Sequence, residues 1–222
     1  MRRLPVVPSP DTIHPLKDVW LRPRRVFREL ATSPIGITDY LLAGAQGVAT
    51  SIALYRSQLA ATHISAGEIF SSSIMFGPVG GVLSTLLFAF IYGRLGKRAG
   101  GTSALNQVFH VLAYGGLPVA ASLLLWGFTG LFIGEAAIIE TPGVAEDGFV
   151  SFVQRAQFLA WVFLLLWSVV LQIMGLSEIL GVLVRKAFAV YVLGQVLALL
   201  AALFLSILIA LLFPGVLPAV PH

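Results

Sequence analysis

The chain has 222 residues, of which 58% are hydrophobic and only 11% are charged. A typical globular domain carries about 25% charged residues, so this composition cannot cover a water-facing surface. The mean hydropathy of +0.93 also indicates that lipid is the solvent for most of the chain. Most classes of soluble enzyme are therefore excluded.

The first element in chain order is an amphipathic segment between Pro15 and Pro34, in the region 1–36 that precedes the first apolar stretch. Pro23 is expected to divide it into two short helices, because proline fits a first helical turn and not an interior. We expect an interfacial helix that anchors the first span, with docking of a protein partner as the alternative. The residues expected to meet membrane lipids are Trp20, Arg22, Arg24, Arg25, Phe27 and Arg28.

Five long charge-free stretches follow this segment. A charge at mid-bilayer costs about 2.5–3.5 kcal/mol, so uncharged stretches are expected to mark the spans, and a helix needs about 20 residues to cross about 30 Å of hydrocarbon. The sequence therefore predicts an all-α, polytopic membrane domain over 37–213 and a short tail at 214–222. The five transmembrane helices are expected at about 37–56, 71–92, 104–132, 157–177 and 187–213.

Two of these spans allow a second interpretation. The first has only 16 charge-free residues and crosses only if Asp39 and Arg56 lie in opposite headgroup layers; a re-entrant or tilted segment is the alternative. The third stretch, 36 residues from Ala99 to Gly134, is longer than one straight helix needs. Because its centre offers no polar loop for a hairpin, we interpret it as one span.

The cations predict the orientation. Twelve of the 14 Lys and Arg residues fall in 1–36 and in the second and third inner loops, so the positive-inside rule places the N-terminus in the cytoplasm and, after five spans, the C-terminus outside. Topology thus accounts for the sequence pI of about 9.8, and no nucleic-acid partner is needed. The use of Arg over Lys, with abundant Ala and Gly, favours a bacterial source and hence a bacterial inner membrane.

The order of these features is similar to that of a known family. The segment Pro15, Trp20, Pro23, Arg24, Phe27 and Leu30 (P-x-x-x-x-W-x-x-P-R-x-x-F-x-x-L) precedes the spans, and LNQVFHVLAYGGLP and WSVVLQIMGLSEILG follow at 105–118 and 167–181. Over 15–213 the chain resembles the Yip (Ypt-interacting protein) domain family, particularly its compact prokaryotic members.

The resemblance implies a non-enzymatic, multi-pass membrane protein without an assigned reaction. Eukaryotic relatives are implicated in vesicle traffic and Rab GTPase binding, with a long cytosolic N-terminal region that carries an Asp-Leu-Tyr-Gly-Pro motif. The nearest match here is Ser33-Pro34-Ile35-Gly36, so Rab binding is not carried over.

Polar side chains recur at a similar depth, roughly 9–13 Å from the inner ends of four predicted spans. Because lipid cannot satisfy amide or imidazole groups, we expect an interhelical hydrogen-bonded layer worth about 0.6 kcal/mol per bond. The alternative is a cytoplasm-facing polar cavity in which His110 and Glu178 exchange protons. The residues at this depth are Gln46, His110, Gln172 and Gln195. Asn106 lies one turn nearer the cytoplasm than His110, and Glu178 lies at the inner end of the fourth span.

A helix break is predicted in the third span at Tyr114, Gly115, Gly116 and Pro118. Pro118 removes the hydrogen bond to the carbonyl of Tyr114, and the two glycines let the chain bend. Transporters use broken helices at mid-membrane. The break therefore belongs with the alternative function, a small permease or channel.

Small residues spaced for close helix packing occur on the first span, at Ala43, Gly47 and Ser51, and on the second and fifth spans. We expect them to pack within the molecule, with a homo-oligomer as the alternative. The others are Gly77 and Gly81 on the second span and Gly194, Ala198, Ala202 and Ser206 on the fifth.

No catalytic constellation, cofactor motif or metal site is predicted. The outer-loop acids Glu135, Glu140, Glu146 and Asp147 could attract a divalent cation, but nothing fixes ligand geometry and a solvated loop is favoured. The predicted function is that of a non-enzymatic integral membrane protein that organises membrane or binds a protein partner of unknown identity.

Overall fold

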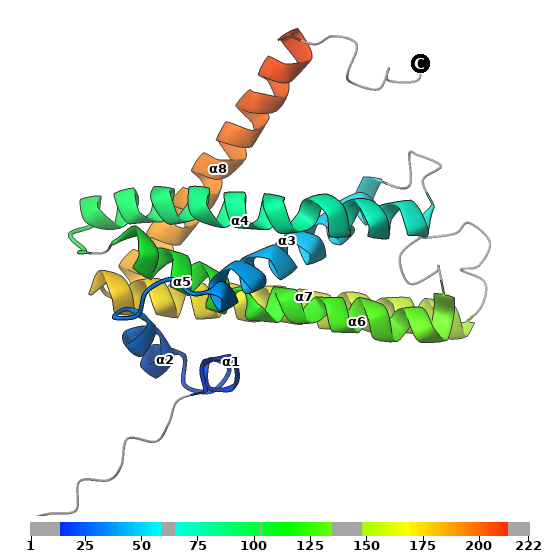
Figure 1. Ribbon diagram of the computed structural model, residues 1–222, viewed down its shortest axis with the longest axis horizontal. Coiled ribbons are helices and arrows are strands. Elements are labelled where there is room, and N and C mark those ends of the chain that lie inside the picture. The colour runs from blue at the N-terminus through cyan, green and yellow to red at the C-terminus, as the bar shows by residue number, and fades with distance from the viewer. Residues whose placement is uncertain (1–13, 59–64, 103, 135–147, 213–222) are drawn as a thin grey trace, which may run out of the picture.

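The computed structural model describes residues 14–58, 65–102, 104–134 and 148–212, and every regular element in this part of the chain is a helix (Figure 1). The predicted acidic outer loop and the tail at 214–222 lie outside the described residues, as does the side chain of Ser206. The helices are α1 (Pro15–Asp18), α2 (Pro23–Leu30), α3 (Ile37–Gln58), α4 (Ala66–Arg98), α5 (Leu105–Gly115), α6 (Leu117–Ile133), α7 (Gly148–Leu180) and α8 (Val184–Leu212).

Four segments of the described chain are long and apolar enough to cross a membrane: α4, α5 together with α6, α7, and α8 as far as Phe204. They correspond to the second to fifth predicted spans. Helices α4 and α7, with 33 residues each, are longer than predicted at both ends, because helical hydrogen bonding continues past the last apolar residue into charged sequence such as Arg94–Arg98. The sequence prediction used charge alone to set these boundaries.

Helix α3 occupies the predicted first span but is not among the four apolar segments. Its 22 residues would extend about 33 Å, which is long enough to cross, but small and polar residues lower its hydropathy. The helix lies in the middle of the bundle, where it packs along α4 and against α5 and α6. Such a helix needs less apolar surface because protein surrounds much of it.

The contact between α3 and α4 is made by backbone against backbone. A Cβ atom at Gly81 would overlap the carbonyl of Ala43 and lie 2.8 Å from the Cα of Gly47, and a Cβ at Gly77 would lie 2.7 Å from the Cα of Val48. Small residues here allow the close helix approach that membrane proteins use in place of the hydrophobic effect. The small residues predicted on the second span therefore pack within the molecule.

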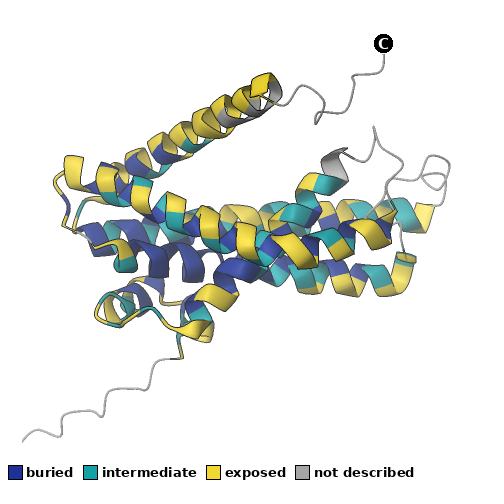
Figure 2. Cartoon of the chain, turned by 45° about the horizontal axis from the view of Figure 1, so that its top comes forward, coloured by how far each residue is buried: buried dark blue, intermediate teal, exposed yellow. Residues whose placement is uncertain are grey.

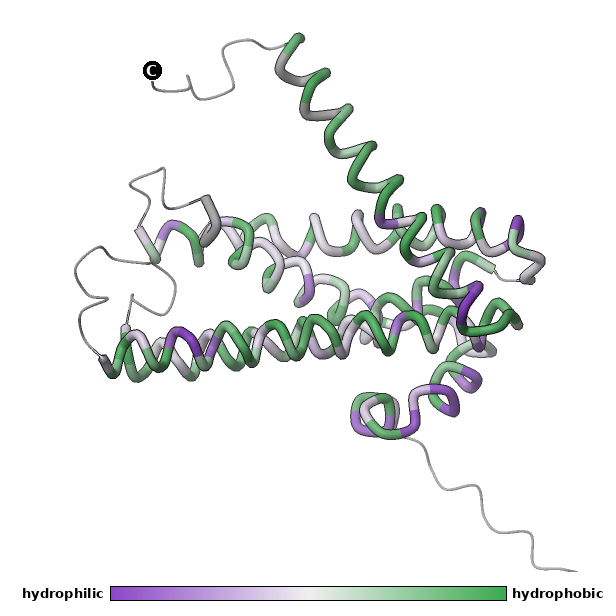
Figure 3. Tube along the Cα trace, turned by 180° about the vertical axis from the view of Figure 1, so that it is seen from behind, coloured by the Kyte–Doolittle hydropathy of each residue, from purple (hydrophilic) through white to green (hydrophobic). Residues whose placement is uncertain are grey.

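Burial is concentrated where α5 meets α2, α4 and α7. All residues of α5 from Val108 to Gly115 are buried, and Figure 2 shows this helix as the most continuously buried element. The outward faces of α7 and α8 are strongly hydrophobic, whereas hydrophilic residues gather on α1, α2 and the adjoining helix ends (Figure 3). An apolar exterior around a buried interior is what a lipid solvent requires.

The N-terminal segment forms two short helices, α1 and α2, and each begins at a proline. The exposed Arg22, Arg24 and Arg28 lie on the outer side of α2 or at its start, but Val26 and Phe27 are fully buried. A Cβ atom at Gly175 of α7 would come within 2.9 Å of the Phe27 ring. Phe27 therefore packs into the protein and not into the headgroup layer, where the sequence analysis expected it.

Candidate functional site

The break between α5 and α6 is held by side chains from two neighbouring helices. Helix α5 ends at Gly115 and α6 begins at Leu117, so carbonyl groups at the end of α5 lose their intrahelical partners. Gln46 Nε2 of α3 donates to the carbonyl of Ala113 at 2.8 Å, and Ser168 Oγ of α7 donates to the carbonyl of Gly115 at 2.9 Å. These bonds satisfy backbone that lipid could not.

The glycines at the break leave room for these side chains. A Cβ atom at Gly116 would overlap the carboxamide of Gln46, and one at Gly115 would lie 2.7 Å from Cγ of Gln172. Gln172 Nε2 in turn donates to Ser168 Oγ at 3.3 Å. Two residues of the predicted polar layer, Gln46 and Gln172, therefore both lie at the predicted break.

His110 makes a buried pair with Asp39. The His110 Nδ1 atom lies 2.5 Å from Asp39 Oδ1, and its Nε2 lies 3.1 Å from the carbonyl oxygen of Ser33. A carbonyl only accepts, so Nε2 carries a proton. Only 2% of His110 and 3% of Asp39 is exposed. The carboxylate of Asp39 is therefore covered by protein.

Asp39 also orders the start of α3, because its Oδ2 accepts a hydrogen bond from the backbone N–H of Gly36 at 2.8 Å. The same carboxylate therefore serves both the helix N-terminus and the imidazole of His110. Acidic groups are favoured at helix N-termini, where backbone N–H groups lack partners. These two contacts compensate for the loss of water around the buried Asp39 carboxylate.

Glu178 lies in a separate, partly exposed ion pair. Its Oε1 accepts from Arg28 Nε at 2.8 Å and from Arg28 Nη2 at 2.7 Å. Nearby, Gln107 Nε2 of α5 donates to the carbonyl of Ala31 at 3.1 Å. The two contacts fasten α2 to α7 and α5. Because His110 and Glu178 have different partners, the proton exchange expected between them has no direct contact to support it.

A cavity of about 450 Å³ lies beside the break and reaches from α3 to α8. Three residues of the predicted polar layer line it: Gln46, Gln172 and Gln195. His110, Asn106 and Glu178 are not among its lining residues; Asn106 is half-buried near the start of α5. The residues of the predicted layer are therefore not in one network. Gln46, Gln172 and Gln195 line the cavity, whereas His110 pairs with Asp39 in the protein interior.

The lining of the cavity is uncharged among the described residues, and it combines apolar side chains with polar ones. Besides the carboxamides it presents the hydroxyls of Thr50, Ser51 and Ser168, and the phenols of Tyr92 and Tyr191. The two tyrosine rings stack, with centroids 5.7 Å apart, and Tyr191 hydrogen-bonds Gln195. Gly194 provides the room for Tyr92, since a Cβ atom there would overlap the ring.

Sequence reasoning missed Asp39, Ser168 and Tyr92. Ser168 could have been found, because it lies one helical turn from Gln172 and so on the same face of α7. Tyr92 could not, because its role depends on its position opposite Gly194. Asp39 entered the sequence analysis only as a charge that bounds the first span, and nothing in the sequence indicates its pairing with His110.

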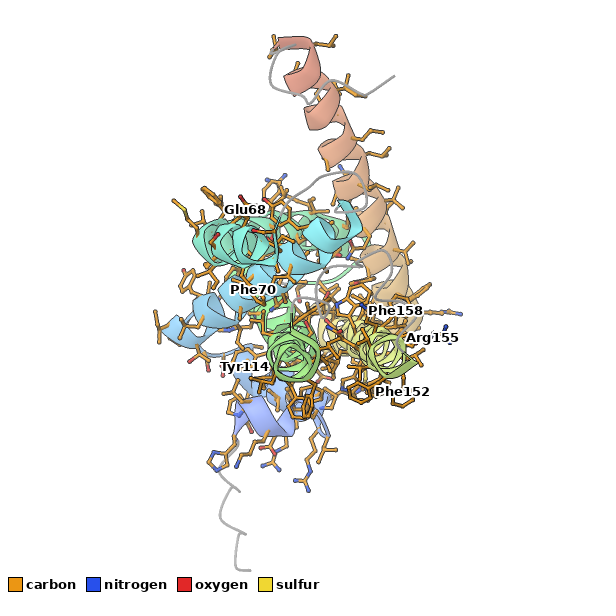
Figure 4. All side chains as sticks on the ribbon, turned by 90° about the vertical axis from the view of Figure 1, so that its right-hand side faces the viewer. Glu68, Phe70, Tyr114, Phe152, Arg155 and Phe158 are labelled. Carbon is orange, nitrogen blue, oxygen red and sulfur yellow. The ribbon has the colours of Figure 1, made fainter. Side chains whose placement is uncertain are left out.

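The opposite end of the bundle carries few charges in the described part of the chain. Figure 4 views this end and shows Glu68 on α4 and Arg155 on α7 pointing away from the bundle on separate sides. Glu68 forms a capping box with Ser65, in which Ser65 N donates to Glu68 Oε2 at 2.8 Å. These residues mark a solvated helix end.

Fold and site together define a multi-pass helical membrane protein with a broken central helix and an uncharged polar cavity. The Yip1 domain model matches residues 17–207, and the chain therefore belongs to the Yip1 domain family. No curated protein and no solved structure matches the chain.

Proposed function

We propose that this chain is a non-enzymatic, five-span member of the Yip1 family, of the compact prokaryotic type, and that it acts by binding other membrane components. The fifth span in this proposal is α3. Helix α3 begins level with the middle of α5, because Asp39 pairs with His110, and it ends where α4 begins. Its 22 residues would extend about 33 Å, which is long enough to cross the hydrocarbon, and this length supports it as a span.

The distribution of charge supports a cytoplasmic N-terminus. The end of the bundle formed by α2, the end of α4 and the start of α8 carries Arg28, Arg94, Lys97, Arg185 and Lys186. At the opposite end, the described residues that carry charge are Arg56, Glu68 and Arg155. By the positive-inside rule the basic end faces the cytoplasm, and an odd number of spans places the C-terminus outside, in a bacterial inner membrane.

The basic face of α2 is proposed to meet anionic lipid at the inner surface. Arg22 and Arg24 are exposed there beside the half-buried Trp20. Arginines near a charged surface contribute about 1 kcal/mol each. Because Phe27 and Arg28 fasten α2 to α7, the segment is held against the bundle and lies in the plane of the interface.

The observation that carries the binding proposal is the path of α8. This helix packs on α4 and α7 near its start, then diverges from the bundle (Figure 1). Ala187, Val190 and Gly194 are buried, and past Gly194 no described residue of α8 is buried. The small-residue face that begins at Gly194 continues through Ala198 into this diverging part, which suits a transmembrane helix of a partner protein.

A photo-crosslinking residue at Ala201, seven residues past Gly194 on the same helix face, tests this proposal in native membranes. We expect a discrete protein adduct at Ala201. The matched control is Phe163, which is 64% exposed on α7 and should give only lipid adducts. The substitution Ala202→Leu, at an exposed position, should remove the adduct without changing the unfolding temperature.

The mass of the adduct identifies the occupant, and a mass of twice the chain would indicate a homo-oligomer. The same adducts at Ala201 and Phe163, or an adduct that persists in Ala202→Leu, would contradict a partner-binding face on α8. A small permease is the second candidate function, and the 450 Å³ polar cavity beside a broken helix favours it.

A further inference from the structure

We propose that the cavity between α3, α4, α7 and α8 binds an uncharged polyhydroxylated group of about the size of one sugar ring. The proposal goes beyond partner binding by α8 and holds whether or not that binding occurs. A volume of about 450 Å³ falls within the range of ligand sites, roughly 300–1,000 Å³. The space far exceeds what a bare metal ion would need.

The charge state of the lining selects the class of ligand. Among the described residues that line the cavity, none is ionised at neutral pH, so a phosphate or a carboxylate would find no counter-charge. Carboxamides and hydroxyls both donate and accept hydrogen bonds. They match a group that also carries several donors and acceptors without charge, which is the chemistry of a polyol.

Several lining hydroxyls already donate to the protein itself. Ser84 and Thr85 donate to the carbonyl of Gly81 at 3.0 and 2.8 Å, and Ser168 donates to that of Gly115. What these groups still offer to the cavity is acceptor oxygen. A ligand with many O–H donors fits such a lining better than an amide or an ether would.

The Tyr92 hydroxyl is a second, independent observation that points to a hydroxylated ligand. Tyr92 is fully buried and lines the cavity, yet its hydroxyl oxygen has no hydrogen-bond partner. Leaving a buried hydroxyl unpaired is costly, and a bound hydroxyl group would satisfy it. Tyr92 also packs against Tyr191 and Phe88, whose ring centroids lie 5.7 Å from that of Tyr92. Tyr191 and Phe88 are half-buried and line the cavity, and their rings suit the apolar face of a sugar ring.

The cavity has a mixed rim. Exposed Leu54 and Leu165 lie beside exposed Thr50 and Gln195, and the rim lies where α8 leaves the bundle. The apolar residues of the rim would contact the acyl chains of a bound lipid, while its polyhydroxylated headgroup would occupy the cavity. The same polyhydroxyl chemistry can come from a glycolipid headgroup or from a free sugar, and an experiment can distinguish the two sources.

The test uses the full chain in lipid nanodiscs with three probes: free glucose, monoglucosyl diacylglycerol, and phosphatidylglycerol as the charged control. Binding is followed by native mass spectrometry and calorimetry. We expect the glucosyl lipid or glucose to bind and phosphatidylglycerol not to compete. Binding of the lipid alone would assign a glycolipid source, and binding of both would assign a site open to free sugar.

Two substitutions locate the binding. Tyr92→Phe removes only the unpaired hydroxyl and keeps the ring against Gly194, so we expect binding to weaken about 3- to 10-fold, while the unfolding temperature of the protein without ligand stays the same or rises. Tyr40→Phe is the matched control, since Tyr40 is 42% exposed and does not line the cavity; it should bind as the wild type does.

The proposal is overturned if neither glucose nor the glucosyl lipid binds at millimolar concentration. It is equally overturned if phosphatidylglycerol binds as tightly as the glucosyl lipid, or if Tyr92→Phe and Tyr40→Phe bind alike. A failure of α8 to crosslink a partner has no bearing on these results, so the two proposals fail separately.

Discussion

Replacing Asp39 by alanine is expected to destabilise the bundle by about 3–5 kcal/mol, the cost of removing one partner from a buried, hydrogen-bonded Asp–His pair. The substitution leaves the His110 imidazole, 2% exposed, without the acceptor that lies 2.5 Å from its Nδ1. It also removes the carboxylate that accepts from the N–H of Gly36 at the start of α3. Reversible unfolding in mixed detergent micelles measures the loss.

The control substitutions distinguish the loss of the Asp39–His110 contact from the loss of the hydrogen bond that Asp39 accepts at the start of α3. Asp39→Asn keeps a side-chain oxygen for Gly36, so it should cost less, about 1–3 kcal/mol. Combining Asp39→Leu with His110→Leu should cost less than the sum of the two single changes, because both polar groups are then gone. A loss below about 0.5 kcal/mol in Asp39→Ala, or strict additivity in the double variant, would show that the pair does not form.

The second large effect is expected at the crossing of α3 and α4. Gly81→Val should destabilise the protein by about 3 kcal/mol or prevent stable insertion, at the upper end of overpacking costs. The atoms that a Cβ would overlap are backbone of Ala43 and Gly47, so no side-chain rotation can relieve the contact. The free energy of unfolding and the yield of folded protein in membranes measure the effect.

The neighbouring glycine gives a matched control on the same helix. A Cβ atom at Gly80 meets nothing within 4 Å, so Gly80→Val should change the free energy of unfolding by less than about 0.5 kcal/mol. The two substitutions add the same atoms at adjacent positions. Equal losses from both would argue against the close backbone contact of α3 and α4.

The sequence allowed the elements to be predicted well because proline, glycine and charge act locally. Pro15 and Pro23 start α1 and α2, and the break at Gly115–Pro118 separates α5 from α6. Runs without charge gave four segments that are apolar enough to span. The ends of α4 and α7 were missed because charged residues there extend the helix beyond the hydrocarbon.

The candidate site could be predicted only in part, because depth along a helix does not fix the direction a residue faces. Gln46, Gln172 and His110 were placed at one level, yet His110 faces Asp39 while the two glutamines line the cavity. The pairing of Asp39 with His110 could not be predicted, because the two residues lie 71 positions apart in sequence. Phe27 was expected to contact lipid because its own segment gives no sign that its ring packs against Gly175 of α7.

The central claim is that α3 crosses the membrane and makes five spans, and cysteine labelling tests it most directly. The chain has no native cysteine, so single cysteines can be placed at the exposed His14 and Thr102 and at position 222, and treated with a membrane-impermeant maleimide. We predict that His14→Cys and Thr102→Cys react only after the cells are permeabilised, and that His222→Cys reacts in intact cells. Reaction of His14→Cys and Thr102→Cys from opposite faces would show that α3 does not cross, and would contradict the account.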